Sequence, residues 1–323
     1  MAGVLVIGAL SEGGLARATL QVASAAAPLA AALGEPLVGA LIGKNLARAA
    51  GEFQCGLAAL YLVEGAHYEP YSADAFMDAA QAVIEASQPT VVLCAQGAPA
   101  REWLPRLAAR MQAGLVMDCI ALTIEDDALM VTKPVNGGGV LAKFAVRGTP
   151  RFATVRASAF QPRATEGHAE LKHLNVAPPA ETRLTVLGEE SAAASGGTRL
   201  KDAKIVVAGG RGVGGPDHWH HIEEVSAVLG AAIGCSRPVA DAGWVASSHQ
   251  VGLSGTSVAP DLYIAVGISG AAQHVAGITA AKTVVAINNS ADAEIFERAD
   301  FGVVDDYREV LRGFVERVKQ LRS

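Results

Sequence analysis

The segment from Leu262 to Asn288 carries polar side chains that could hold a ligand. Ser269, Gln273 and His274 follow an apolar run, and Asn288 ends the next one. Amide, hydroxyl and imidazole groups supply both donors and acceptors, so they can bind ligand oxygens and read a polar edge. A single histidine at a helix start is usually solvated or structural. The close grouping of these residues favours a binding role.

Two arginines add positive charge elsewhere in the same third of the chain. Arg211 lies inside the run AGGRGVGG, and Ser236 with Arg237 follows the short apolar segment AAIGC. A guanidinium group can contact a phosphate or an electron-rich ring. For Arg237 the alternative interpretation is a surface salt bridge.

The run AGGRGVGG also matches a dinucleotide-binding pattern, through Gly210-x-Gly212-x-x-Gly215. Glycines between a strand and a helix let backbone N–H groups approach a phosphate. Such turns often serve packing alone, so both interpretations stay open.

A glycine-punctuated loop, His249 to Tyr263, could lie against a flat ligand, although any turn could have this composition. The cluster His218-Trp219-His220-His221 suggests either a metal site or a solvated helix start. No carboxylate or thiolate stands at convincing ligand spacing, and we expect no metal.

Several classes of function are disfavoured by composition. The net charge is −6 and no basic run occurs, so nucleic acid is not expected as a partner. No apolar run reaches the roughly 20 residues that span a bilayer, and no signal peptide is recognised, so we expect a cytoplasmic protein that is not membrane-embedded. Cys94 and Cys119 lie in apolar runs and should be buried thiols. Without a Ser-His-Asp order or paired catalytic carboxylates, the chain should hold a redox cofactor rather than break bonds, and no catalytic residue is predicted.

The elements that position these residues follow from periodicity. The first half alternates strands, expected at 4–9, 36–42, 58–63 and 91–95, with helices, expected at 14–33, 45–51, 73–87 and 102–112. This alternation predicts a parallel α/β sheet. From Leu115 to Phe160 short strands with close turns predict an antiparallel extension, and residues 170–187 could form an edge strand.

A composition shift divides the chain. Proline, serine and glycine gather between residues 161 and 197, and a new strand begins near Lys204. We therefore predict an amino-terminal domain at 1–188, a flexible linker at 189–199 and a second domain at 200–323. The segment 262–288 reads as one βαβ unit of a parallel sheet, with its polar residues at the strand ends where open α/β sheets bind ligands.

Taken in order, these blocks closely resemble the electron-transfer flavoprotein alpha subunit. The second domain matches from end to end, through GGRG, the Ser-Arg of GCSRPVADAG, QVG-x-x-G, LYIAVGISGAAQH, VVAIN and ADFGVVDD. The first domain resembles the family less sharply, through GLVMDCIAL, KPVNGGG and TVRASAF. The resemblance implies an α/β protein of two domains, namely an amino-terminal Rossmann-like domain with an antiparallel extension and a carboxyl-terminal doubly wound parallel-sheet FAD-binding domain.

The resemblance also implies which residues contact FAD. Carried over by position, they are Arg211, Ser236, Arg237, Val251, Gly252, Leu253, Ser254, Ser269, Gly270, Ala271, Ala272, Gln273, His274, Asn288, Asp306 and Tyr307. Ser254 takes the position near flavin N5, His274 the position near the N1/O2 side, and Arg237 the position against the isoalloxazine. Leu253 departs from the family pattern, because many relatives have glutamine there.

By the same resemblance the chain is an electron carrier and not an enzyme. It would pair in a heterodimer with a beta subunit that contacts the amino-terminal domain and usually carries AMP. It would accept electrons from flavin dehydrogenases, typically the acyl-CoA dehydrogenases of fatty acid beta-oxidation, and pass them to a membrane electron-transfer flavoprotein-quinone oxidoreductase. The linker would let the FAD domain swivel between these partners.

Two other classes remain open on the sequence. The glycine-rich run could belong to an NAD(P)-binding oxidoreductase subunit, which would need an acid or base residue that the chain does not offer. The first half alone could belong to a nucleotide-sensing protein without redox chemistry.

Overall fold

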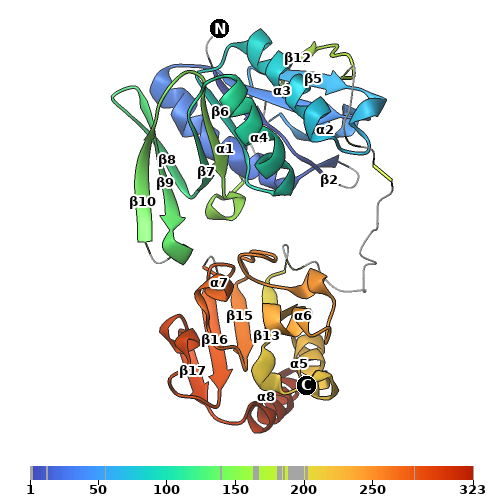
Figure 1. The fold of residues 1–323 in the computed structure, drawn as a ribbon, viewed down its shortest axis with the longest axis vertical. Coiled ribbons are helices and arrows are strands. Elements are labelled where there is room, and N and C mark those ends of the chain that lie inside the picture. Colours follow the sequence, from blue (N-terminus) through green and yellow to red (C-terminus); the bar gives the residue numbers. More distant parts are fainter. Residues whose placement is uncertain are drawn as a thin grey trace. The chain divides into compact units, whose positions relative to one another are not determined.

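The computed structural model describes most of the chain, namely residues 3–11, 14–54, 56–138, 140–162, 167–179, 184, 186–187, 200, 203–279 and 281–322. Contacts between residues divide the chain into two compact units (Figure 1). Unit 1 comprises residues 1–135 and 141–189, and unit 2 comprises residues 136–140 and 190–323. The predicted linker, 189–199, lies outside the described residues.

Unit 1 is built on a seven-stranded sheet whose order is β12-β5-β4-β1-β6-β11-β7. The strands are β1 (Val4–Ile7), β4 (Leu37–Gly43), β5 (Ala59–Glu64), β6 (Val91–Ala95), β7 (Leu115–Cys119), β11 (Arg151–Val155) and β12 (Glu170–His173). Every pairing in this sheet is parallel. β4 is buried along all seven residues, as expected for a central strand covered on both faces.

Four helices complete unit 1: α1 (Arg17–Leu33), α2 (Ala47–Glu52), α3 (Ala73–Ser87) and α4 (Ala98–Arg110). Alternate residues of β1 enter two separate cores, with Val4 and Val6 facing α1 and α2, and Leu5 and Ile7 facing α3 and α4. α4 begins four residues before the predicted start, because Pro99 is tolerated in the first turn of a helix.

The predicted antiparallel extension is correct only in part. β8 (Ala121–Glu125) and β9 (Ala128–Val135) pair antiparallel, and they form a three-stranded sheet with β10 (Val140–Val146). β7 and β11, which we also expected in the extension, are instead parallel strands of the main sheet. The short turns beside them are local features, whereas the partner of each strand is chosen by long-range burial.

The predicted edge strand within 170–187 is confirmed for its first half. Glu170–His173 forms β12, which pairs with β5 at the edge of the main sheet. Most of the second half lies outside the described residues. A small hairpin, β2 (Leu10–Ser11) with β3 (Gly14–Leu15), follows β1.

Unit 2 contains a five-stranded sheet in the order β14-β13-β15-β16-β17. The strands are β13 (Ile205–Gly209), β14 (Ala232–Cys235), β15 (Leu262–Val266), β16 (Thr283–Asn288) and β17 (Phe301–Val304), all parallel. The chain runs from β13 outward to β14 and then returns to β15 on the other side of β13. This reversal is the topological switch point of a doubly wound sheet, where ligands bind beyond the carboxyl ends of the strands.

The helices of unit 2 are α5 (His220–Leu229), α6 (Arg237–Asp241), α7 (Ala272–Val275) and α8 (Tyr307–Arg322). α5 and α8 cover one face of the sheet, while α7 and the loop before β15 cover the other. A 3-10 turn at 216–218 precedes α5. Among the described residues, no helix has the length and apolar character needed to cross a membrane.

The buried cysteines are as expected. Cys94 and Cys119 are buried within unit 1, and burial raises the pKa of each thiol to about 12. Cys235 is also fully buried, directly before Ser236.

Candidate functional site

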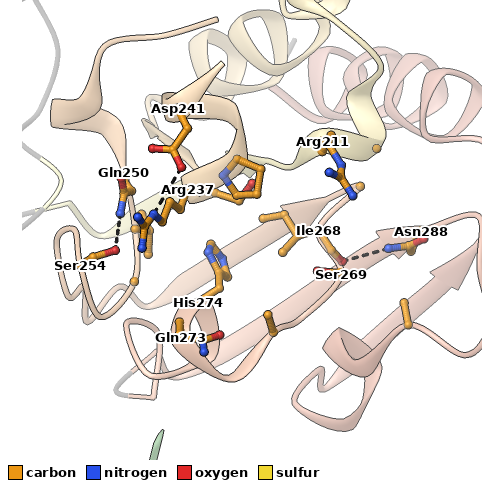
Figure 2. A pocket seen from close by; sticks show the side chains of 18 of the residues that line it. Arg211, Arg237, Asp241, Gln250, Ser254, Ile268, Ser269, Gln273, His274 and Asn288 are labelled. Carbon is orange, nitrogen blue, oxygen red and sulfur yellow. Dashed lines mark hydrogen bonds and ion pairs between the residues drawn. The ribbon is translucent and has the colours of Figure 1, made fainter. Parts of the chain in front are cut away.

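A cavity of about 680 Å³ opens at the switch point of unit 2 (Figure 2). Ligand pockets typically have volumes of roughly 300–1,000 Å³, so this one can hold a large cofactor. Its walls come from the carboxyl ends of β13, β14, β15 and β16 and from the loop before β15. The lining residues are Arg211, Gly212, Ser236, Arg237, Pro238, Asp241, Gln250, Val251, Gly252, Ser254, Gly267, Ile268, Ser269, Ala271, Gln273, His274, Asn288, Ser290 and Ala293.

The structure brings together eleven of the sixteen residues that the sequence assigns to FAD. They are Arg211, Ser236, Arg237, Val251, Gly252, Ser254, Ser269, Ala271, Gln273, His274 and Asn288. These positions span 78 residues of sequence, and adjacent parallel strands place them on one edge of the sheet.

Five assigned residues do not line the cavity. Gly270 is buried because its backbone packs against Ile295, while Leu253 and Ala272 are exposed beside the cavity. Tyr307 packs in the core under α8 and its hydroxyl donates to the Val213 carbonyl at 3.0 Å. Asp306 accepts hydrogen bonds from the backbone and side chain of Arg308, at the start of α8.

The glycines of the run AGGRGVGG have a packing role. The Gly210 and Gly212 N–H groups donate to the carbonyls of Val266 (2.8 Å) and Gly267 (2.9 Å). A Cβ at Gly212 would lie 2.8 Å from the Gly267 oxygen, and one at Gly210 would lie closer still. Since these two N–H groups are already paired, they are not available to a ligand, and the loop contributes the Arg211 side chain to the cavity.

The two arginines supply the positive charge of the cavity. Arg237 is the first residue of α6 and its side chain is 68% exposed. Its Nε lies 3.3 Å from Asp241 Oδ2, one helical turn on, which orients the guanidinium (Figure 2). With Arg211, the lining residues carry two cations and one carboxylate, so the cavity favours an anionic ligand.

His274 is a buried group on the cavity wall. Its Nε2 lies 2.9 Å from the Tyr263 hydroxyl, while Nδ1 is buried and has no hydrogen-bond partner within the described part of the chain. Burial lowers the pKa of His274 to about 4, an effect that the nearby Val251 carbonyl partly offsets. The ring is therefore neutral near pH 7.

Two amide side chains brace the cavity. Gln250 Nε2 donates to the Ser254 hydroxyl at 2.8 Å, which leaves the Ser254 proton free to point elsewhere. Asn288 donates to the Ile268 carbonyl at 2.9 Å and accepts from the Ser290 N–H at 3.0 Å, so it ties the loops after β15 and β16 together.

Two further cavity residues, Gly212 and Gln250, lie in the glycine-rich run and in the loop 249–263 that the sequence singled out. Six were missed by sequence reasoning: Pro238, Asp241, Gly267, Ile268, Ser290 and Ala293. Asp241 could have been found from its spacing of four residues from Arg237 on a helix. Gln250 adjoins the assigned Val251. The others are recognised only from the way the loops fold back on the strand ends.

The histidine cluster lies at the start of α5. His220 Nδ1 lies 2.9 Å from the Asp217 carbonyl, and the His220 and His221 rings pack 4.0 Å apart. Burial and the neighbouring positive charges lower the pKa of His221. In the residues that the structure describes, no group of three or more His, Cys, Asp or Glu side chains is placed to hold a metal.

The cavity has the properties that an FAD site requires. It combines the size for a dinucleotide, two guanidinium groups for negative charge, and a buried His274 nitrogen that has no hydrogen-bond partner among the residues that the structure describes. A buried polar atom without a partner is costly unless a ligand satisfies it. The fold and the cavity thus define a protein that binds an anionic nucleotide cofactor at the switch point of a doubly wound sheet.

Comparison with known proteins specifies the family. Residues 4–179 match the family model "Electron transfer flavoprotein domain", and residues 199–279 match "Electron transfer flavoprotein FAD-binding domain". The chain is 36% identical over 323 residues to the electron transfer flavoprotein subunit alpha of Mycobacterium leprae, which covers 99% of both proteins. The same subunit from Bacillus subtilis is 35% identical over 321 residues (98% of both), and that from Thermoanaerobacterium thermosaccharolyticum 33% over 319 residues (96% of both).

The chain belongs to the electron transfer flavoprotein alpha-subunit family. It carries the FAD-binding domain of that family, and it is an electron carrier rather than a catalytic enzyme. The resemblance seen in the sequence is confirmed, and the comparisons favour it over a nicotinamide-binding subunit.

Proposed function

We propose that this chain is the alpha subunit of a heterodimeric electron-transfer flavoprotein, and that its cavity holds the FAD through which electrons pass. The observation that supports this most directly is the cavity at the switch point of unit 2, where Arg211, Arg237 and the group around His274 converge. FAD, when bound, supplies the ability to accept and release electrons. The side chains bind it, orient it and exclude water.

The sixteen assigned residues divide into two groups in this proposal. The eleven that line the cavity would contact the FAD directly, with Arg211 and Arg237 neutralising negative charge. Leu253 and Ala272, which are exposed beside the cavity, and Asp306, which follows β17, would meet only those parts of the cofactor that extend past the cavity. Tyr307, which is buried with its hydroxyl bonded to Val213, would support the site through packing. Gly270 would act through its turn, because its backbone is enclosed by Ile295.

The partners follow from family membership. A beta subunit would complete the heterodimer through unit 1 and carry AMP. Flavin dehydrogenases, in particular the acyl-CoA dehydrogenases of fatty acid beta-oxidation, would reduce the FAD, and a membrane electron-transfer flavoprotein-quinone oxidoreductase would reoxidise it. We place this work in the cytoplasm, as expected from the sequence.

The domain arrangement has a role in the same proposal. Residues 1–188 would form the partner-binding domain, 200–323 the FAD domain, and 189–199 a linker on which the FAD domain swivels between donor and acceptor. Shortening this linker should slow electron transfer while FAD stays bound. Equal transfer rates for the shortened and full-length chains would remove the swivel from the proposal.

The direct test is to purify the chain with its beta subunit and record the visible spectrum. We expect a yellow complex that releases FAD on denaturation and whose flavin is bleached by an acyl-CoA dehydrogenase with its substrate. A colourless complex that binds NAD(P) would instead support the oxidoreductase alternative. A flavin that this dehydrogenase leaves oxidised, while other flavin dehydrogenases reduce it, would change the assigned donor and retain the carrier.

A further inference from the structure

Tyr263 lies behind the cavity wall and holds the His274 ring. Tyr263 is in β15 and is fully buried, with its hydroxyl 2.9 Å from His274 Nε2. His274 comes from α7 and lines the cavity. Tyr263 itself does not line the cavity, so any influence that it has on a ligand acts through His274.

The hydrogen bond between Tyr263 and His274 indicates which ring nitrogen of His274 carries the proton. In the described part of the chain, His274 Nε2 is the one hydrogen-bond partner that the structure gives the Tyr263 hydroxyl. A neutral imidazole carries its proton on one nitrogen and accepts at the other. If Nε2 carried the proton, the Tyr263 O–H and the Nδ1 lone pair would both lack a partner in the described residues, whereas a proton on Nδ1 leaves only the Nδ1–H without one. The favoured arrangement is therefore an O–H that donates to an unprotonated Nε2, with the ring proton on Nδ1.

The neutral state of the ring is consistent with its surroundings. His274 is buried, and among the described residues the hydroxyl of Tyr263 and the carbonyl of Val251 lie against it. Neither carries a full charge, and the Val251 carbonyl, which favours the imidazolium, only partly offsets the effect of burial. Because the ring is neutral, its single N–H proton lies on either Nδ1 or Nε2.

We propose that Tyr263 is a positioning residue that fixes the orientation of His274 and its Nδ1–H tautomer, so that the cavity wall presents a neutral N–H donor to the cofactor. This inference rests on the proposed FAD site for its functional consequence, but the tautomer itself is a property of the chain alone. In the described residues the Nδ1 atom is buried and no hydrogen bond to it is recorded, so it is the ring nitrogen that remains for the ligand.

The test is nitrogen-15 NMR of the full chain labelled at histidine, recorded without and with FAD near pH 7. The His274 signals are identified by their loss in His274→Gln. We expect Nδ1 to show a protonated shift and Nε2 an unprotonated one. An unmade buried hydrogen bond costs about 1–3 kcal/mol, so the bias toward Nδ1–H should be roughly 5- to 140-fold. A wild-type ring protonated mainly at Nε2, or at both nitrogens, would overturn the proposal without any variant.

Tyr263→Phe gives the second measurement, since it keeps the ring and removes the hydroxyl. We expect most of the tautomer bias to disappear and the midpoint potential of bound FAD to shift. The matched control is Tyr68→Phe, which removes a buried hydroxyl in unit 1 that has no hydrogen-bond partner in the described residues. It should leave the His274 signals and the potential unchanged. An unaltered His274 tautomer in folded Tyr263→Phe contradicts the proposal.

The two proposals fail in different ways. A chain that never binds FAD would refute the proposed function, yet its histidine spectrum would still report the tautomer. A yellow protein whose His274 is protonated at Nε2 would retain the function and refute the role of Tyr263.

Discussion

Each unit contains a parallel sheet with a switch point, but the two units use that point differently. In unit 1, β1 lies between β4 and β6, and in unit 2, β13 lies between β14 and β15, so each parallel sheet has a switch point at its first strand. Such points are where open α/β sheets bind ligands. What differs is the chemistry of the side chains that follow the strands.

The polar groups at the strand ends of unit 1 are paired with one another. After β1, the Thr19 hydroxyl accepts from the Ala9 N–H and donates to the Ala9 carbonyl. After β11, Arg156 binds both oxygens of Asp118, at 2.9 and 2.5 Å. The same edge includes a hydrogen bond from Thr154 to Gln96. Groups that satisfy each other in this way have little need of a ligand.

The strand ends of unit 2 keep polar groups available. Arg211 and Arg237 are exposed at the cavity, and His274 Nδ1 has no partner in the described residues. The backbone around them is tightly packed, because Gly210, Gly212 and Gly267 bring two loops together. The comparison teaches that topology offers a place for a site, while unpaired groups on a rigid backbone make one.

The largest expected effect tests that rigid backbone. Gly270→Ala places a Cβ against the backbone of Ile295 at a φ of +93°, so we expect a loss of about 3 kcal/mol or more in the unfolding free energy of unit 2. Gly230→Ala is the matched control, since its φ is +65° but no atom lies within 4 Å of the new Cβ. It should cost about 1 kcal/mol. Urea unfolding measures both, and equal losses would show that the close packing of Gly270 is unimportant.

The next effect is a pH dependence confined to unit 2. The pKa of His274 is lowered from 6.5 to about 4 by burial, so the folded chain resists the proton that the unfolded chain accepts. Its contribution to stability is complete above pH 6.5 and is lost as the pH falls toward 4, by about 3 kcal/mol. Urea unfolding of the FAD-free chain from pH 7 to 4, compared with His274→Asn, measures this loss.

The fluorescence of the three tryptophans distinguishes the units in that experiment. Trp219 and Trp244 report on unit 2 and Trp103 on unit 1, so a Trp103→Phe background isolates the unit that contains His274. If the stability of the His274→Asn variant depends on pH as that of the wild type does in this background, burial of the His274 ring does not cause the pH dependence.

A pair of arginine variants sharpens the comparison of strand ends. Arg156→Ala removes the ion pair with Asp118, in which the side chains of Arg156 and Asp118 are 24% and 29% exposed. The unfolding free energy of unit 1 should fall by about 1–3 kcal/mol, and FAD affinity should be unchanged. Arg237→Ala should change stability by less than about 0.5 kcal/mol but weaken FAD binding roughly 10- to 100-fold. Urea unfolding and FAD titration of both variants measure the contrast. The reverse result, an FAD effect from Arg156 and none from Arg237, would contradict the assignment of the site to unit 2.

The smallest effect concerns one hydroxyl. Ser254→Ala removes the partner of Gln250 at the open cavity, where water can replace it, so stability should fall by about 1 kcal/mol or less. If the Ser254 hydroxyl also bonds the flavin, losing a hydrogen bond of about this energy would shift the two-electron midpoint potential of bound FAD by roughly 10–30 mV. Spectroelectrochemistry measures the shift, and Ser254→Thr, which keeps a hydroxyl, should restore the wild-type potential. Identical potentials for all three proteins would show that the hydroxyl does not influence the flavin.

Local sequence determined much of this protein. The periodic spacing of apolar residues and the composition predicted most strands and helices within a few residues. They also predicted the division into two α/β domains and the buried positions of Cys94 and Cys119. The order of motifs in the second domain predicted the family and eleven of the residues that line the cavity. These features are readable because strand and helix periodicity and short ligand-binding loops are written in contiguous residues.

Only the tertiary structure decided which distant segments meet. β7 and β11 joined the main sheet although their neighbours form an antiparallel hairpin, because the burial of β11 beside β6 outweighs the closeness of turns. The glycines at 210 and 212 serve packing against Gly267, and their paired N–H groups are not available to a ligand. The hydrogen bonds of Tyr263 with His274 and of Gln250 with Ser254 exist only because the loops fold back on the strand ends. Side-chain direction and pairing depend on the whole packed fold, so a local pattern cannot specify them.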